Sequence, residues 1–187
     1  NVVSASLDLR AILEAALDKL LELMAMGGGN AYRLAASGDT LILMARRGRA
    51  TEGLPEERYL PLTAIASREA LAGGAIAAPI ERMGESEIWQ EARREGWRQV
   101  VLVPLVSKDE LLGLIMLYSF SARRVAQNEL SLLTTIGNQI GVAVENARLY
   151  REAGRLAAMA ERNRLAQDLH DSVTQTIFAA SLLAGVI

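Results

Sequence analysis

Apolar residues recur at helical spacing in two parts of the chain. Between Leu9 and Met24 they fall three and four positions apart, which predicts an amphipathic helix. Asp8 is a plausible N-cap of this helix, and Gly27-Gly28-Gly29 would end it. From Asn128 to the last residue, a second helix-compatible segment of about 60 residues contains no proline. It is far longer than the ~11 to 12 residues of an average globular helix, so we expect it to need a partner.

Two pairs of apolar runs, each joined by turn-forming residues, predict β-hairpins. The first pair is 31–35 and 40–45, and the second, rich in β-branched residues, is 99–106 and 111–118. Between the hairpins we expect shorter elements, namely a helix over 63–71, a strand over 75–80 and a helix over 86–95. This order predicts an antiparallel sheet with helices packed on it, an α+β domain followed by a long C-terminal helix.

The long helix carries an apolar stripe whose spacing alternates between three and four residues. The stripe consists of Leu133, Ile136, Ile140, Ala143, Ala147 and Tyr150. Such a stripe is either the seam of a two-stranded coil or a surface that covers the sheet of the same domain. Because it continues into Leu156 and Met159, we favour a homodimer. Gly154 interrupts the helix at a cost of ~1 kcal/mol relative to alanine and is a candidate hinge.

Composition narrows the classes of function. A net charge of −2 without a long basic run is not that of a nucleic-acid binder. The chain has no cysteine and only one histidine, His170, so we expect no disulfide, no thiol chemistry and no metal centre. It contains neither an apolar run of the ~18 to 20 residues that a membrane span needs nor a signal-peptide pattern at its start. We therefore expect a cytoplasmic protein, although the full-length protein could be tethered to a membrane.

His170 has the surroundings of a nucleophile. At ~100° per residue, Leu165, Leu169 and Val173 share an apolar arc that would form a bundle core, and His170 lies at its rim. Asp171 could accept a proton from one ring nitrogen and leave the other free to attack an electrophile. Asp171 and Gln175, one turn apart, could also hold a water molecule for attack on a phosphoryl group. Taken alone, however, a His-Asp pair on a helix is usually a solvated surface pair or a cap.

The residues around this histidine carry a more specific resemblance. Residues 161–175 read Glu-Arg-Asn-Arg-Leu-Ala-Gln-Asp-Leu-His-Asp-Ser-Val-Thr-Gln. This string resembles the phosphoacceptor motif of the nitrate-sensor-like and desaturase-sensor-like two-component histidine kinases, Glu-Arg-x-Arg-Ile-Ala-Arg-Glu-Leu-His-Asp-x-x-x-Gln. The resemblance implies that His170 is autophosphorylated, that Asp171 is the activating base, and that Asp171 and Gln175 act in dephosphorylating the response regulator. Gln167 stands where the family has arginine, so a phosphate or acidic-partner contact at that position is in doubt.

A second resemblance covers roughly residues 7 to 152. Val103-Pro104-Leu105, Leu112-Gly113-Leu114, Glu129-Leu130 and residues 145–150 are, in this order and spacing, similar to the C-terminal half of GAF domains. Such domains sense small molecules or only dimerise, and they have a GAF-like antiparallel sheet flanked by helices. We therefore expect a GAF sensor domain with flanking helices over 1–152, and a linker with the first helix of a dimerisation and phosphoacceptor domain over 153–187.

The same resemblance bears on the ligand of the domain. Other GAF domains attach bilins through cysteine, bind haem through histidine, or bind cyclic nucleotides with an Asn-Lys-Phe-Asp-Glu signature. None of these features occurs before His170. We expect an unknown small molecule instead, in an apolar pocket lined by some of Met44, Trp89, Trp97, Val103 and Met116. The competing interpretation is that these five side chains are ordinary core.

Together, the resemblances imply the sensory and phosphoacceptor region of a sensor histidine kinase. We expect the chain to be a fragment that is inactive alone, because ATP and Mg²⁺ would be bound by a kinase domain whose boxes are not found in it. The partners implied are a second copy of the chain and the receiver domain of a response regulator. The alternative is a non-catalytic GAF module for dimerisation or small-molecule binding. A small hydrolase is disfavoured, because the chain lacks a second histidine, a cysteine and a metal cluster.

Overall fold

The structure is a computed structural model. It describes the backbone of residues 2–48 and 59–184, and the side chains of residues 9–48, 59–170 and Val173. The chain divides into two compact units, Asn1–Ala147 and Arg148–Ile187. The sequence predicted a boundary between 152 and 153, five residues further along. In the described residues, none of the helices has the length and apolar character required to cross a membrane.

The first unit is built on a six-stranded sheet in which all neighbouring strands are antiparallel. Its order is β3-β2-β1-β6-β5-β4. The strands are β1 Gly28–Leu34, β2 Thr40–Gly48, β3 Tyr59–Pro61, β4 Ile76–Pro79, β5 Gln99–Ser107 and β6 Glu110–Ser119. Both predicted hairpins and the predicted antiparallel sheet are confirmed. The sequence did not predict β3, because three residues are too short to show an alternating pattern.

The second hairpin turns tightly. Lys108 and Asp109 lie between β5 and β6 with φ values of 50° and 64°. Positive φ at both central residues is the feature of a type I′ turn, whose twist matches that of the flanking strands. This turn holds β5 beside β6 in the middle of the sheet.

The helices are α1 Val2–Met24, α2 Arg68–Ala72, α3 Glu87–Arg94 and α4 Gln127–Ala184, with short 3-10 turns at Leu62–Ala64 and Ile80–Arg82. Asp8 lies inside α1, so its prediction as N-cap is wrong, and Gly28 and Gly29 belong to β1. The helix expected over 63–71 is divided into a 3-10 turn and α2. The division falls at Ser67, which caps α2 by accepting a hydrogen bond from the backbone N–H of Ala70 at 3.2 Å.

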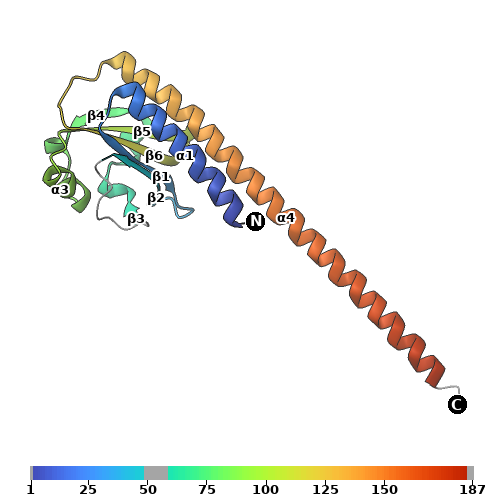
Figure 1. Cartoon of the computed structure of the whole chain (residues 1–187). Helices are drawn as coiled ribbons and strands as arrows, with labels where there is room; N and C mark the ends of the chain where they lie inside the picture. Colours follow the sequence, from blue (N-terminus) through green and yellow to red (C-terminus); the bar gives the residue numbers. More distant parts are fainter. Residues whose placement is uncertain (1, 49–58, 185–187) are drawn as a thin grey trace. The chain divides into compact units, whose positions relative to one another are not determined.

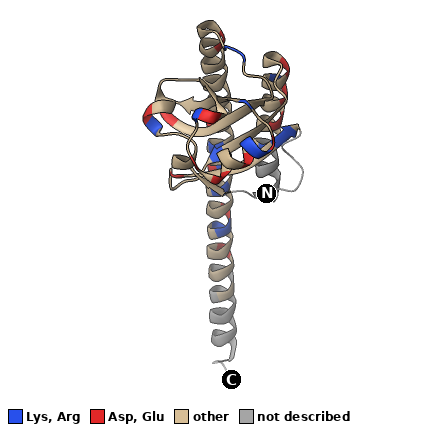
Figure 2. Cartoon of the chain, turned by 90° about the vertical axis from the view of Figure 1, so that its left-hand side faces the viewer, with Lys and Arg blue, Asp and Glu red and all other residues tan. Residues whose placement is uncertain are grey.

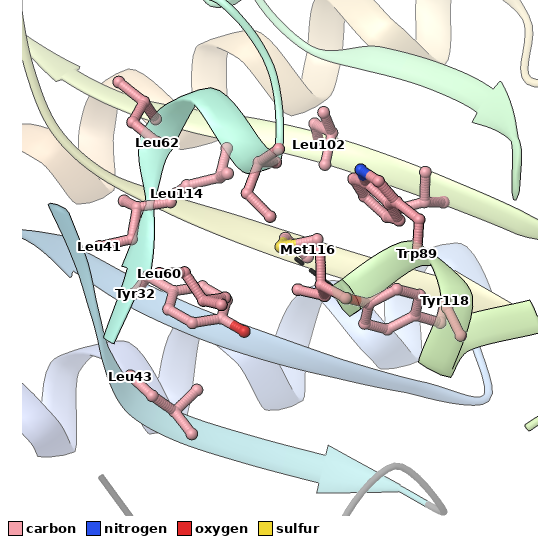
Figure 3. Packing of buried hydrophobic residues seen from close by; sticks show 14 of the residues in the cluster. Tyr32, Leu41, Leu43, Leu60, Leu62, Trp89, Leu102, Leu114, Met116 and Tyr118 are labelled. Carbon is pink, nitrogen blue, oxygen red and sulfur yellow. Dashed lines mark hydrogen bonds between the residues drawn. The ribbon is translucent and has the colours of Figure 1, made fainter. Parts of the chain in front are cut away.

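Each face of the sheet has its own apolar core. Figure 1 shows α1 and the first part of α4 along one face, with α3 on the opposite side. The α1-side core contains Leu13, Leu17, Val101, Val103, Leu105, Ile115, Leu117 and Leu133, among others. The α3-side core contains Tyr32, Leu41, Leu60, Trp89, Leu102, Leu114, Met116 and Tyr118, among others, most of them labelled in Figure 3. Successive residues of β5 and β6 enter opposite cores, because side chains alternate across a strand.

The first part of the apolar stripe on α4 packs within the chain. Leu133 is completely buried in the α1-side core, and Ile136 and Ile140 are partly buried against it. The second of the two interpretations, that the stripe covers the sheet of its own domain, therefore holds for these three residues. The sheet has an apolar surface of its own, and a helix that packs on it needs the same spacing of apolar residues as a helix in a coiled coil.

Two glycines let α4 lie close to β5. A Cβ atom at Gly137 would lie 2.4 Å from the carbonyl oxygen of Pro104, and one at Gly141 would lie 2.3 Å from that of Val106. No larger residue fits at these two positions without moving backbone. The close approach thus fixes the start of the helix that leads to His170.

Candidate functional site

His170 lies in α4, in a stretch that is helical and exposed throughout residues 161–170. The predicted phosphoacceptor is therefore on a helix surface and not in a core. It lines a shallow surface hollow together with Ala166, Gln167 and Asp168. Asp171 and Gln175 also lie in α4, but their side chains are outside the described residues. A reagent or partner domain can thus reach this face of the helix.

One arginine links two carboxylates on the turns that precede His170. Nε and Nη2 of Arg164 donate to the two carboxylate oxygens of Glu161 at 3.0 and 2.8 Å, and Nη1 donates to Asp168 at 2.9 Å. The hydrogen bonds from Arg164 lower the pKa of Glu161, and Glu161 raises the pKa of Arg164. Spacings of three and four residues place these side chains on neighbouring turns. The network orients the charged side chains along this part of the helix.

The predicted bundle core is exposed within this single chain. Leu165, Leu169 and Val173 each leave about half or more of their surface accessible, with Leu169 at 66%. Leu156 and Met159 are exposed as well. Leu165, Leu169 and Val173 follow one another at intervals of four residues and form an exposed apolar row beside His170, whereas Arg162 and Asn163 separate Met159 from Leu165. A row of this kind is what a helix presents when another helix covers it.

The five predicted pocket residues are divided between the two faces of the sheet. Trp89, Trp97 and Met116 belong to the α3-side core, whereas Val103 is buried in the α1-side core and Met44 packs against the latter. The sheet therefore separates Met44 and Val103 from the other three, and the five do not surround one space. A lone sequence gives no direct sign of the face that each strand residue takes.

The two tryptophans play different parts in the α3-side core. Trp89, in α3, is almost completely buried and faces the sheet beside Met116 (Figure 3). Trp97 stacks on Phe120 with ring centroids 3.8 Å apart, and its indole N–H donates to Glu95 at 2.8 Å. Its ring also lies where a side chain at Gly28 would be, 3.1 Å from that Cβ position. Trp97 thus closes one end of this core over β1.

The sequence analysis did not identify a buried polar pair beside these aromatic residues. Asn30 in β1 lies opposite Arg46 in β2, and both carry buried polar atoms that have no hydrogen-bond partner in the described part of the chain. A possible signal was the asparagine within an apolar strand. No sequence pattern, however, pairs it with an arginine sixteen positions away. Elsewhere on the unit both signs of charge are interspersed, as Figure 2 shows.

The comparisons with known proteins agree with this architecture. Residues 6–145 match the GAF domain family, and residues 161–187 match the histidine kinase family. A relative, the sensor histidine kinase YhcY of Bacillus subtilis (strain 168), is 40% identical over 90 residues, which is 48% of this chain and 24% of that protein. The chain thus spans about a quarter of the length of this curated relative.

Solved structures share the fold of the first unit. The GAF domain of Thermosynechococcus elongatus PixJ, in its blue-light absorbing form, has a TM-score of 0.63 at 22% identity, over 83% of this chain and 94% of that chain. The GAF domain of a two-component sensor histidine kinase from Bacillus halodurans has a TM-score of 0.62 at 19% identity, over 75% of this chain and 95% of that chain. At these identities the likeness shows the fold alone.

The first unit has the fold of a GAF domain, and the second unit carries His170 on an exposed helix. The chain belongs to the GAF domain family. With the histidine kinase match and the relative, this confirms the prediction of a sensory and phosphoacceptor region of a two-component histidine kinase.

Proposed function

We propose that the full-length protein transfers the γ-phosphoryl group of ATP to His170 and from there to an aspartate of a response regulator. The observation that carries the proposal is the exposed position of His170 on a helix that matches the histidine kinase family. Exposure matters because the imidazole must meet two partners in turn, first ATP on its binding domain and then the receiver domain.

The transfer needs one nitrogen with a free lone pair. We assign Asp171 as the group that accepts the proton of one ring nitrogen while the other attacks the γ-phosphorus. A phosphorus–nitrogen bond forms, the bond from the γ-phosphorus to the bridging oxygen breaks, and ADP leaves with the electron pair. In the reverse role, Asp171 and Gln175 hold the water that hydrolyses the phosphoaspartate of the response regulator.

ATP and Mg²⁺ belong to a nucleotide-binding domain in this proposal. The 187 residues contain no boxes of that kind, so we expect that this chain alone does not phosphorylate itself. We place the kinase in the cytoplasm, where ATP and response regulators are available.

The GAF domain would supply the signal, and a second copy of the chain would complete the scaffold. The exposed apolar side chains of α4, among them Leu156, Met159, Leu165 and Leu169, support a homodimer formed along this helix. A small molecule bound in the GAF domain would shift the population of two arrangements of the paired helices and so alter access to His170. This coupling is part of the proposal.

The test joins this chain to a kinase domain, or uses the natural full-length protein, and follows labelled phosphate from ATP. His170→Gln should abolish incorporation, whereas Ser172→Ala, two residues away, should retain it. The label should be lost in acid and kept in base, as expected for a phosphoramidate. Unchanged incorporation in His170→Gln would refute the assignment, and would leave the non-catalytic GAF module as the function of this chain.

A further inference from the structure

A polar pair lies within the α3-side face of the sheet. Asn30 and Arg46 are direct cross-strand partners in β1 and β2, so their side chains share one face. That face is fixed by Asn30, whose side chain is 5% exposed and whose Nδ2 donates to the hydroxyl of Tyr32 at 3.2 Å. Tyr32 belongs to the α3-side core. The pair is therefore on the side of the sheet where Trp89 and Trp97 pack.

Three polar atoms of this pair are buried and lack a hydrogen-bond partner among the residues described, namely Nε and Nη2 of Arg46 and Oδ1 of Asn30. Nε and Nη2 form one edge of the planar guanidinium, and their N–H bonds on that edge are parallel. This edge is the one that matches the two oxygens of a carboxylate. Buried N–H groups and a buried acceptor without hydrogen-bond partners are costly, and such groups therefore point to a ligand.

We infer that Asn30 and Arg46 form the polar end of the sensory site and bind a small carboxylate that also carries an O–H or N–H donor. This inference rests on the proposed sensory role of the GAF domain. The edge of Arg46 would hold both carboxylate oxygens, and Oδ1 of Asn30 would accept the donor. Because opposite side chains start only ~5 Å apart, the donor belongs on the carbon next to the carboxylate, as in a 2-hydroxy acid or an amino acid.

The neighbours of the pair favour an organic carboxylate over inorganic phosphate. On its other side, Asn30 lies opposite Met116 of β6, and Gly28, two residues along β1, lies under the ring of Trp97. These neighbours are apolar or aromatic and suit a carbon skeleton. Inorganic phosphate has no carbon skeleton to pack against them. The ligand should therefore carry one anionic group, one hydrogen-bond donor and an apolar carbon skeleton.

Four small molecules of similar size, added to the purified chain, test these requirements one at a time. Lactate has the carboxylate and the hydroxyl, propionate lacks the hydroxyl, lactamide lacks the charge, and inorganic phosphate tests for general anion binding. Binding is followed by the NMR signal of the Arg46 Nε–H and by the fluorescence of Trp89 and Trp97. Lactate should bind more tightly than propionate, and both more tightly than phosphate or lactamide. Phosphate binding as well as lactate, or neither carboxylate moving the Arg46 signal, would overturn the inference.

Three variants assign the binding to the pair. Arg46→Gln should weaken lactate binding about tenfold or more, the usual loss for a hydrogen bond to a charged group. Asn30→Leu should weaken lactate binding but leave propionate binding unchanged. Arg47→Gln is the matched control, because Arg47 lies one residue further along β2 and donates to Asp18 of α1 at 2.8 Å. Equal loss in Arg47→Gln and Arg46→Gln would contradict the assignment.

A stability measurement checks the inference without a ligand. If the Nε and Nη2 edge of Arg46 is kept for an anion, Arg46→Met should raise the melting temperature of the dialysed protein, because it removes two buried N–H groups without partners. A lower melting temperature, or a crystal structure in which a carboxylate of the chain itself occupies the Arg46 edge, would show a structural role instead. These measurements are independent of phosphorylation at His170, so the failure of one proposal is distinguishable from the failure of the other.

Discussion

The two units use the same apolar residue types at the same helical spacing with opposite results. In α4, Leu133 of the first unit is completely buried, whereas Leu169 of the second unit is 66% exposed. The difference lies in what faces each residue, because the sheet of the GAF domain covers Leu133 and its α1-side neighbours. An apolar stripe therefore predicts that a helix packs against something, but it does not identify the surface against which the helix packs.

This contrast has a consequence for function. The first unit has two cores and folds around a single sheet, so its apolar surface is satisfied by its own chain. The second unit keeps its apolar row accessible, together with His170. A domain with two closed apolar cores is thus followed by a helix whose apolar surface is accessible.

The largest effect is expected from shortening the buried leucine of α4. Leu133→Ala should lower the free energy of unfolding of the first unit by about 2 to 5 kcal/mol, because it leaves a cavity in the α1-side core. Leu132→Ala is the matched control, since its side chain is 48% exposed and should cost less than about 0.5 kcal/mol. Urea unfolding measures both. Equal losses would mean that α4 does not pack on the sheet.

A glycine pair on the same helix gives the next largest contrast. Gly141→Ala would place a Cβ atom 2.3 Å from the backbone oxygen of Val106 and should destabilise the first unit by about 1 to 3 kcal/mol. At Gly154 the structure shows nothing within 4 Å, so Gly154→Ala should stabilise the helix by about 1 kcal/mol. Thermal unfolding monitored by circular dichroism should move in opposite directions. A stabilising Gly141→Ala would contradict the close packing of α4 on β5.

The exposed apolar side chains of the second unit should govern association and not folding. Replacing Leu156 and Met159 together by lysine should weaken self-association at least about tenfold, since it replaces exposed apolar side chains by charged ones. Sedimentation velocity over a range of concentrations measures the effect, and unfolding of the GAF domain should be unchanged. A native chain that stays monomeric at high concentration would remove the dimer from the proposal.

The smallest effect concerns the start of α4. Glu129 accepts a hydrogen bond from the backbone N–H of Ala126 at 2.8 Å and pairs with Arg123, and these contacts lower its pKa from 4.5. A lowered folded-state pKa gives stability that is present above the unfolded value and is lost as pH falls through the folded value. Glu129→Gln should therefore reduce stability at neutral pH and flatten its decline below about pH 4.5. An unchanged acid limb of the stability curve would show that Glu129 contributes nothing there.

The elements with long, regular patterns could be predicted from the sequence. The first hairpin follows from the turn residues Ser37-Gly38-Asp39, and α3 was expected over 86–95 and spans Glu87–Arg94. Strand β3 has no such pattern, and the start of α1 was placed at Asp8 because that residue type is a common N-cap. Among the site residues, His170 could be found from its motif. The pocket residues were chosen by residue type alone, which does not distinguish the faces of a sheet.

The GAF and phosphoacceptor motifs, the alternation of the strands and the helical character of the C-terminal segment could be recognised without a structure, because each depends on residues close together in the chain. The position of Arg46 opposite Asn30 depends instead on how two strands pair. The register of β1 with β2 shifts between Ala31 and Tyr32, where Met44 is the extra residue. Beyond this bulge every side chain of β2 changes face, because the period of a strand is two residues. Arg47 therefore reaches α1, and Arg46 enters the side of the sheet that carries the aromatic core.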